Sequence, residues 1–365
     1  KGRLQPGKMF LVDINEGRII SDEEIKAKIS TQKPYKKWVE ENQVNLKDLP
    51  ALDFKFKLEL DTLLQKQTAF GYTAEDIKIV IAPMIGTGQE ATGSMGNDTP
   101  LAVLSEKPQL LFHYFKQLFA QVTNPAIDSI REELVMSMEV TLGKELNLLD
   151  ESPEHCRKLK IEHPILTGKE MEKIRDLDKK DLKTVTLPTL FPTSGGAAGM
   201  EQALDELCQN ASRSIKEGAT ILLLSDKGMD ADNVAIPSLL ATSSVHHHLL
   251  RERTRTQVGL TVETGEAREM MHFALLIGYG AGAVYPYLAY QTVAQIAREG
   301  VFVDKLDDET AIENFIKATR KGLFKIIAKM GISTIQSYRG AQIFEAVGLS
   351  DSTIDKYFTG TPSRV

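Results

Sequence analysis

The residues of this 365-residue chain whose types could do chemistry gather in Ser225–Asn233, SDKGMDADN, between an apolar run and a helical pattern. The loop carries Asp226, Asp230 and Asp232. Three carboxylates so close together can supply a base or hold a cation. The same residue types also favour turns and cap the helix that follows. We interpret the acids as loop and capping residues and keep catalysis as the alternative.

A run of histidines, His246–His248, lies within the predicted helix Ser238–Leu250. Adjacent helical residues point about 100° apart, so three in a row cannot converge on one metal ion. The four-residue spacing of a helical metal-binding pair, as in H-E-x-x-H, is absent from the sequence. We expect one histidine to pack inward with a hydrogen bond and the other two to lie at a partly buried surface.

Two glycine-rich stretches have the composition of phosphate-binding loops. Gly86–Pro100 lacks the lysine of G-x-x-x-x-G-K-[ST] and the spacing of G-x-G-x-x-G, which favours a turn-rich connection. Ser194–Gly199, with Gly195 and Gly196, leads into a helix whose backbone N–H groups could hold an anion. We favour a strand-to-helix turn packed closely on its neighbours, with a phosphate site as the alternative.

Composition indicates an ordinary globular protein, with 42% hydrophobic and 26% charged residues. The net charge of −6 offers no general basic field for nucleic acid, and no apolar run approaches the length of a membrane span. Cys156 and Cys208 are too few for an iron–sulfur cluster and are expected to be reduced thiols. The chain opens KGRLQPG and stops at TGTPSRV, which we interpret as a segment of a longer polypeptide.

The elements that must position these residues alternate between strand and helix from residue 185 onward. Repeated β–α alternation predicts parallel strands, and fewer than eight units are clear, so a complete barrel is not expected. The expected strands are Val185–Leu190, Thr220–Leu224, Gln257–Val262, Ala283–Tyr285 and Ile332–Ile335. The expected helices are Met200–Glu217, Ser238–Leu250, Ala267–Ile277, Leu288–Arg298, Glu309–Met330 and Gly340–Val347.

The part of the chain before residue 185 is predicted to be mostly helical. A hairpin, helices that include an aromatic stripe of Phe112, Phe115 and Phe119, and an extended arm are expected. The hairpin is Met9–Asp13 with Gly17–Ile20, the helices are Ser21–Ser30, Thr73–Ile81, Ser105–Val122 and Asp128–Glu139, and the arm is Tyr35–Asp61. A soft sub-boundary is expected within residues 142–183, which carry two prolines and a run of mixed charge.

Long stretches of the chain resemble the large subunit of glutamate synthases. Four of them are KMFLVDINEGRIISDEEIK, LLLSDKGMDADNVAIPSLLATSSVHHHLL, GLTVETGEAREMMHFALLIGYGAGAVYPYLA and KMGISTIQSYRGAQIFEAVGLS. The resemblance is to the central domain, which joins the amidotransferase domain to the FMN-binding barrel. It implies an α/β fold that is an incomplete, rudimentary TIM-barrel-like parallel β/α domain. It assigns residues 1–20 to the end of the amidotransferase domain, 21–350 to the central domain and 351–365 to the lead into the FMN-binding domain.

The resemblance also implies what the segment does. Glutamate synthases split glutamine at one site and carry ammonia through an internal tunnel to 2-oxoglutarate at an FMN site, with electrons from ferredoxin or NADPH. The family's glutaminase nucleophile is an N-terminal cysteine, where this chain has Lys1. The FMN and iron–sulfur residues belong to the following domain. A non-catalytic connecting domain is therefore expected, with no catalytic, cofactor or metal residue of its own.

The resemblance gives the segment two partners, the amidotransferase and FMN-binding domains of the same polypeptide, with ammonia in transit. Its setting is the cytoplasm, or the plastid stroma if the source is a plant or alga. We expect loops after the strands to contact these domains or line the ammonia path. Two alternatives remain: an independent barrel-like enzyme using the Asp226–Asp232 loop, and a flavin-phosphate-binding module at Ser194–Gly199. The candidate residues are Gly195, Gly196, Ser225, Asp226, Gly228, Asp230, Asp232, Glu263 and Glu266.

Overall fold

The computed structural model describes residues 2–91, 100–118, 125–179 and 181–364. Its centre is a five-stranded sheet with the order β13-β12-β10-β8-β7. The first four strands of this order are mutually parallel, and only β7 is antiparallel to its neighbour. The strands are β7 (Asp178–Lys179), β8 (Leu182–Pro188), β10 (Ile221–Ser225), β12 (Gly259–Glu263) and β13 (Ala283–Tyr285).

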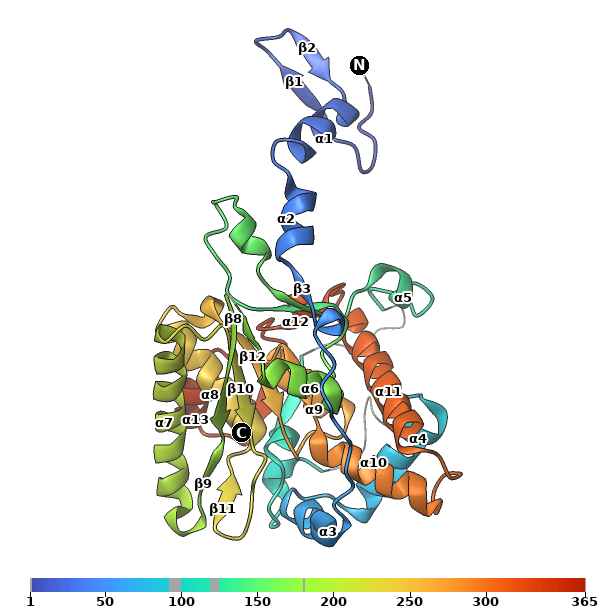
Figure 1. Cartoon of the computed structure of the whole chain (residues 1–365), viewed down its shortest axis with the longest axis vertical. Helices are drawn as coiled ribbons and strands as arrows, with labels where there is room; N and C mark the ends of the chain where they lie inside the picture. Colours follow the sequence, from blue (N-terminus) through green and yellow to red (C-terminus); the bar gives the residue numbers. More distant parts are fainter. Residues whose placement is uncertain (1, 92–99, 119–124, 180, 365) are drawn as a thin grey trace.

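Helices cover the sheet, and Figure 1 shows α7 and α8 on one side of it and α10 and α11 on the other. The strands β10 and β12 are buried along their whole length, and β10 has the apolar run that burial on both faces favours. The β–α alternation expected from residue 185 onward and the parallel pairing are confirmed. The helices are α7 (Gly196–Lys216), α8 (Ser238–Arg251), α9 (Met270–Gly278), α10 (Tyr287–Glu299) and α11 (Asp308–Lys329).

The expected helix Ser105–Val122 is wrong. Pro108 precedes a single 3-10 turn, Leu111–Tyr114, and the chain then pairs as β4 (Phe115–Gln117) with β14 (Phe344–Val347). The expected helix Gly340–Val347 is wrong for the same reason, because this pairing between distant segments overrides local preference. Phe112 and Phe115 still enter the core, whereas Phe119 lies outside the described residues.

Two shorter expectations also fail. In place of a helix over Asp128–Glu139 the chain forms only α5 (Glu132–Val135) and then extends into β5 (Val140–Leu142). In place of a strand at Ile332–Ile335 it forms one bridge, from Ser137 to Thr334, and then α12 (Ile335–Tyr338). Gly86–Pro100 falls mostly on residues 92–99, which lie outside the described part of the chain.

The N-terminal part extends away from the body of the molecule (Figure 1). The predicted hairpin forms as β1 (Leu11–Asp13) and β2 (Arg18–Ile20), followed by α1 (Asp22–Ser30) and α2 (Tyr35–Asn42). After β3 (Val44–Asn45) an extended arm runs across the body to α3 (Leu60–Ala69). The remaining elements are α4 (Ala82–Thr87), β6 (Leu159–Ile161), α6 (Gly168–Arg175), β9 (Leu190–Pro192), β11 (Asn233–Ala235), α13 (Asp351–Tyr357) and β15 (Ser363–Arg364).

Candidate functional site

The carboxyl edge of the parallel sheet gathers buried acids. Ser225, Glu263 and Tyr285, the last residues of three strands, pair with one another across the sheet. Asp226 follows Ser225 directly, so it lies at the same edge as Glu263, and both side chains are 1% exposed. Ligands of α/β proteins bind outside this edge, and it is therefore the first place to look for chemistry.

Asp226 ties two loops together. Thr264 Oγ1 donates to its Oδ2 at 2.6 Å, and the Gly265 N–H donates to its Oδ1 at 3.0 Å. Burial raises the pKa of Asp226 to about 8, although the hydrogen bonds from Thr264 and Tyr287 work against the shift. The carboxyl group is therefore largely neutral at pH 7. Its partners come from the loop after β12 and from the start of α10, so its geometry is that of a structural link.

The other two buried acids are also fully used. Glu263 accepts a hydrogen bond from the Ser225 hydroxyl and one from Arg175 Nη2 at 2.7 Å. Glu266 Oε2 accepts from both the N–H and the hydroxyl of Ser238, each at 2.6 Å. Ser238 is the first residue of α8, whose N-cap, Pro237, has no capping side chain. An acid from a different loop therefore caps this helix.

The remaining candidate residues are exposed: Gly195, Gly196, Gly228, Asp230 and Asp232. Asp230 Oδ1 accepts from the N–H groups of Asp232 and Asn233 at 2.9 and 2.8 Å, which confirms the expected hydrogen bonding inside the loop. The expected capping of the following helix by these acids is wrong, because Glu266 bonds the first residue of α8. The Asn233 and Asp232 amides lower the pKa of Asp230. The expected close packing of Ser194–Gly199 is wrong, because nothing lies within 4 Å of a Cβ built on Gly195 or Gly196.

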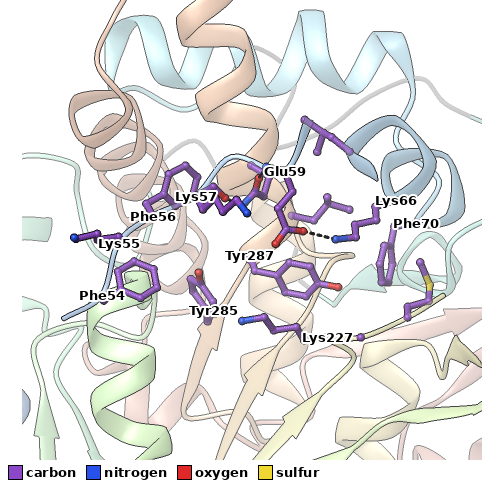
Figure 2. Close-up of a pocket in the computed structure, with 15 residues that line it drawn as sticks. Phe54, Lys55, Phe56, Lys57, Glu59, Lys66, Phe70, Lys227, Tyr285 and Tyr287 are labelled. Carbon is purple, nitrogen blue, oxygen red and sulfur yellow. Dashed lines mark hydrogen bonds and ion pairs between the residues drawn. The ribbon is translucent and has the colours of Figure 1, made fainter. Parts of the chain in front are cut away.

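A pocket of about 200 Å³ opens at the carboxyl edge (Figure 2). Tyr285, Tyr287, Lys227 and Gly228 form its floor, and the extended arm forms its outer wall. The charged groups on this wall include an ion pair between Glu59 Oε2 and Lys66 Nζ at 2.7 Å, drawn as a dashed line in Figure 2. The arm residues that line the pocket are Phe54, Lys55, Phe56, Lys57 and Glu59.

The arm is fixed to the body by specific contacts. The Glu59 N–H donates to Gln291 Oε1 at 2.9 Å, and Gln291 Nε2 donates to the Lys57 carbonyl at 2.7 Å. The ring of Phe54 packs so closely on Gly168 that a Cβ there would lie 2.3 Å from it. The sequence predicts for this segment an extended arm or linker with short helices, without the contacts that fix it. Its alternation of phenylalanine and lysine, FKFK at 54–57, is the pattern that could have indicated a half-buried extended segment.

The three neighbouring histidines do not share a ligand. His247 is buried and contacts the Ser243 hydroxyl at 3.1 Å, whereas His246 accepts from Arg255 Nε at 2.9 Å. His248 and the Ser212 hydroxyl lie 2.8 Å apart. His246 and His248 are partly buried, so the expected arrangement of one inward and two surface histidines is confirmed.

Burial disfavours the thiolate form of one of the two cysteines. Cys156 and Cys208 are both free and half-buried. Burial raises the pKa of the Cys208 thiol to about 11, which keeps it protonated at pH 7. The Cys208 thiol therefore lacks the lowered pKa that activates cysteine nucleophiles.

Comparison with known proteins places the chain in a family. Residues 65–350 match the glutamate synthase central domain, and residues 1–38 match the class-II glutamine amidotransferases. The chain belongs to the glutamate synthase central domain family. Within the part of the chain that the structure describes, no helix is long and apolar enough to cross a membrane.

Relatives match this chain along its whole length. It is 48% identical over 365 residues to the NADPH glutamate synthase large chain of Bacillus subtilis, which covers 100% of this chain and 23% of the relative. It is 43% identical to ferredoxin-dependent glutamate synthase 2 of Synechocystis, with 100% of this chain and 24% of the relative covered. For the chloroplastic ferredoxin-dependent enzyme of Spinacia oleracea the identity is 42%, with 100% and 23% covered. The chain thus spans about a quarter of the length of these relatives.

Solved structures give only distant matches. The flavin-binding domain of baker's yeast flavocytochrome b2 has a TM-score of 0.32 at 14% identity, covering 55% of this chain and 45% of that chain. The GMP reductase of Trypanosoma brucei with guanosine 5'-monophosphate has a TM-score of 0.30 at 13% identity, covering 54% and 51%. These scores are too low for an argument about the fold.

Proposed function

We propose that this segment is the non-catalytic connecting domain of a glutamate synthase and that its carboxyl edge helps to enclose the path of ammonia. The observation that carries the proposal is how the buried acids at that edge are bonded. Its three buried acids, Asp226, Glu263 and Glu266, all hold loops and a helix in place. An edge whose buried acids all hold other segments in place is suited to shape a passage rather than to react.

The charge state of the edge also suits a neutral molecule in transit. A free carboxylate would bind ammonium by charge-assisted hydrogen bonds and retain it. Asp226 is largely neutral below its pKa of about 8, and Glu263 is paired with Arg175. Loops with small residues, such as Gly228 in the pocket floor, leave room for a narrow path.

The arm supplies a physical link between the two functions that a connecting domain must join. It runs from the side of the N-terminal hairpin to the pocket at the carboxyl edge (Figure 1). The hairpin lies in residues 1–38, which match amidotransferases. In this proposal, the amidotransferase domain lies next to the hairpin and the FMN-binding domain follows the segment in the same polypeptide.

The origin of the domain and its place in the cell are part of the same proposal. The four parallel strands are taken as a rudimentary form of the FMN-binding barrel that no longer carries its cofactor. FMN and the iron–sulfur cluster would reside in other domains of the enzyme. The setting would be the cytoplasm, or the plastid stroma in a plant or alga.

The test is a bulky substitution in the pocket floor of a full-length glutamate synthase that contains this segment. Gly228 has a left-handed φ of +103° and lines the pocket. In Gly228→Trp, we expect glutamine hydrolysis to continue while glutamate formation from glutamine and 2-oxoglutarate falls. The ratio of glutamine hydrolysed to glutamate formed should rise from its coupled value, with flavin content unchanged.

Gly218→Trp is the matched control. Gly218 also has a left-handed φ, +92°, but it precedes β10 at the opposite end of the strand, and nothing lies within 4 Å of its added Cβ. This variant carries the same backbone strain away from the pocket, so its two rates should stay coupled. If Gly228→Trp remains coupled as well, the domain is a spacer and the ammonia-path proposal fails.

A further inference from the structure

A polar cluster outside the pocket joins two segments that are distant in the sequence. His113 lies in the 3-10 turn Leu111–Tyr114, and Glu269 and His272 lie at the start of α9. Each of the three side chains offers one ligand atom, and these atoms all lie within 4.8 Å of one another. The cluster could not be predicted from the sequence, because no local spacing connects His113 with the other two residues.

Aromatic packing holds the cluster in place. The ring of Phe112, which is buried, stacks on His272 with centroids 4.2 Å apart and planes 20° from parallel. Gln109 Oε1 lies 3.3 Å from Nδ1 of His113. When Nδ1 donates its proton to Gln109, the lone pair on Nε2 of His113 is available to a metal ion.

One nitrogen of the cluster has no hydrogen-bond partner. His272 is 1% exposed, and its Nε2 lies 3.0 Å from Glu269 Oε1 without the geometry of a hydrogen bond. A buried polar atom without a hydrogen-bond partner is unfavourable, and a bound ion would provide a partner for this nitrogen. Glu269 occupies the N-cap position of α9, yet its side chain makes no capping hydrogen bond, so its carboxylate is directed to the cluster and not to the helix.

We propose that His113, Glu269 and His272 form a site for a divalent transition metal of the zinc class. Two imidazoles and one carboxylate are the three protein ligands of several open zinc sites, in which water takes the fourth position. The Glu-x-x-His spacing of Glu269 and His272 brings a carboxylate and an imidazole to one face of a helical turn. His113 is exposed, so the ion can enter from solvent.

Metal binding requires one small adjustment, and a nearby cation does not prevent it. Nδ1 of His272 now faces the Arg268 N–H at 3.4 Å, and coordination through Nε2 moves the ring proton to Nδ1 and breaks this long contact. The guanidinium of Arg268 does not oppose the ion strongly, because Asp76 lies 3.0 Å from it and the carbonyl groups of Phe70 and Gly71 also hold it. The bound ion would fasten residues 109–114 to α9 and has no part in the ammonia path.

Zinc titration of the chain after treatment with a chelator tests the site. We expect one Zn²⁺ per chain by calorimetry, and Co²⁺ in its place should give visible d–d absorption bands of a site with nitrogen ligands. His113→Gln and Glu269→Gln should each weaken binding by roughly tenfold or more, because each removes one of three protein ligands. His113 is exposed, so its variant should fold normally, which circular dichroism checks.

The matched control is His248→Gln, which removes a partly buried histidine outside the cluster and should bind zinc like the unchanged chain. Zinc should also raise the thermal unfolding temperature of the unchanged chain and of His248→Gln, but not that of His113→Gln. Failure of the unchanged chain to bind zinc stoichiometrically would overturn the proposal. Equal affinity in His113→Gln, Glu269→Gln and the unchanged chain would do the same.

Discussion

At the scale of single residues, the strand register decides which acids meet. Parallel strands that end in register bring Asp226 and Glu263 to one edge although they are far apart in the sequence. Each buried acid is then satisfied by donors from a neighbouring loop or helix, as buried polar groups require. The carboxylate of the exposed Asp230 instead accepts from N–H groups of its own loop.

Asp226→Asn should change how stability depends on pH. The folded-state pKa of Asp226 is about 8, above its ordinary value of 3.8. Its contribution to stability is therefore fully present below about pH 4 and is lost as the pH rises through about 8. Asparagine cannot ionise, so the free energy of unfolding of the native chain should fall relative to that of Asp226→Asn, by an amount on the order of a few kcal/mol.

Urea unfolding at a series of pH values between about 4 and 9 measures this difference. Asp232→Asn, which changes an exposed acid of the same loop, should instead follow the native chain at every pH. Parallel stability curves for the native chain and Asp226→Asn would contradict the expectation, because they would mean that Asp226 has the same pKa folded and unfolded.

At the scale of elements, α8 depends on a residue outside itself. Both the N–H and the hydroxyl of Ser238 donate to Glu266, and Ser238 is buried. Glu266→Ala leaves these two donors without a partner, so we expect a loss of about 2–3 kcal/mol in the free energy of unfolding. Glu266→Gln keeps an acceptor oxygen, so its free energy of unfolding should fall by less. Chemical denaturation measures all of these values.

Glu252→Ala provides the comparison at the other end of α8, where Glu252 is the exposed C-cap residue. The free energy of unfolding of this variant should stay within about 0.5 kcal/mol of the native value, as for most surface substitutions. An equal loss in Glu266→Ala and Glu252→Ala would show that the bond to Ser238 does not stabilise the start of α8.

The sequence was informative where burial is complete and misleading where pairing is distant. A strand buried on both faces, such as Ile221–Ser225, has a continuous apolar run and needs no tertiary information to be recognised. The aromatic spacing around Phe112 fits a helix as well as it fits a turn followed by a strand. The choice between the two depends on the pairing of β4 with Phe344–Val347. Local spacing cannot contain such a partner.

The same limit applies to the candidate site. The loops after β10 and β12 could be placed at one edge from the strand pattern alone, because parallel strands share their carboxyl ends. The arm at 54–59 could not be placed, since its contacts with Gln291 and Gly168 join segments that no local pattern connects. The cluster of His113 and Glu269 was missed for the same reason.

At the scale of the whole molecule, the N-terminal hairpin stands apart from the body (Figure 1). Just after α1, Lys33 donates to the Glu151 carbonyl, and Tyr35, the first residue of α2, donates to the Glu151 carboxylate. A two-stranded hairpin is marginally stable without further cover. Large apolar side chains are nevertheless exposed on and beside it: Phe10, Leu11, Val12, Ile14 and Ile19. The register pairs Val12 with Ile19, so at least these two exposed apolar side chains lie on one face of the hairpin, where another protein surface could cover them.

This hairpin should make the chain associate with itself when it is produced alone. In the proposed enzyme the amidotransferase domain would cover the apolar face, whereas in the isolated chain only a second copy can do so. Sedimentation equilibrium should therefore show a mass that rises with concentration. The triple variant Phe10→Ser, Ile14→Ser, Ile19→Ser should remain a monomer over the same range, because the association depends on burying these side chains.

Leu148→Ser with Leu149→Ser is the matched control, since these two side chains are also highly exposed, at 84% and 91%, but lie in a different loop. If association depended only on the exposed apolar area, the triple variant and the control would both associate less than the unchanged chain. An interface specific to the hairpin affects only the triple variant, and the control then associates like the unchanged chain. If the control becomes monomeric and the triple variant does not, the hairpin is not the covered face, and the docking of an amidotransferase domain there loses its physical support.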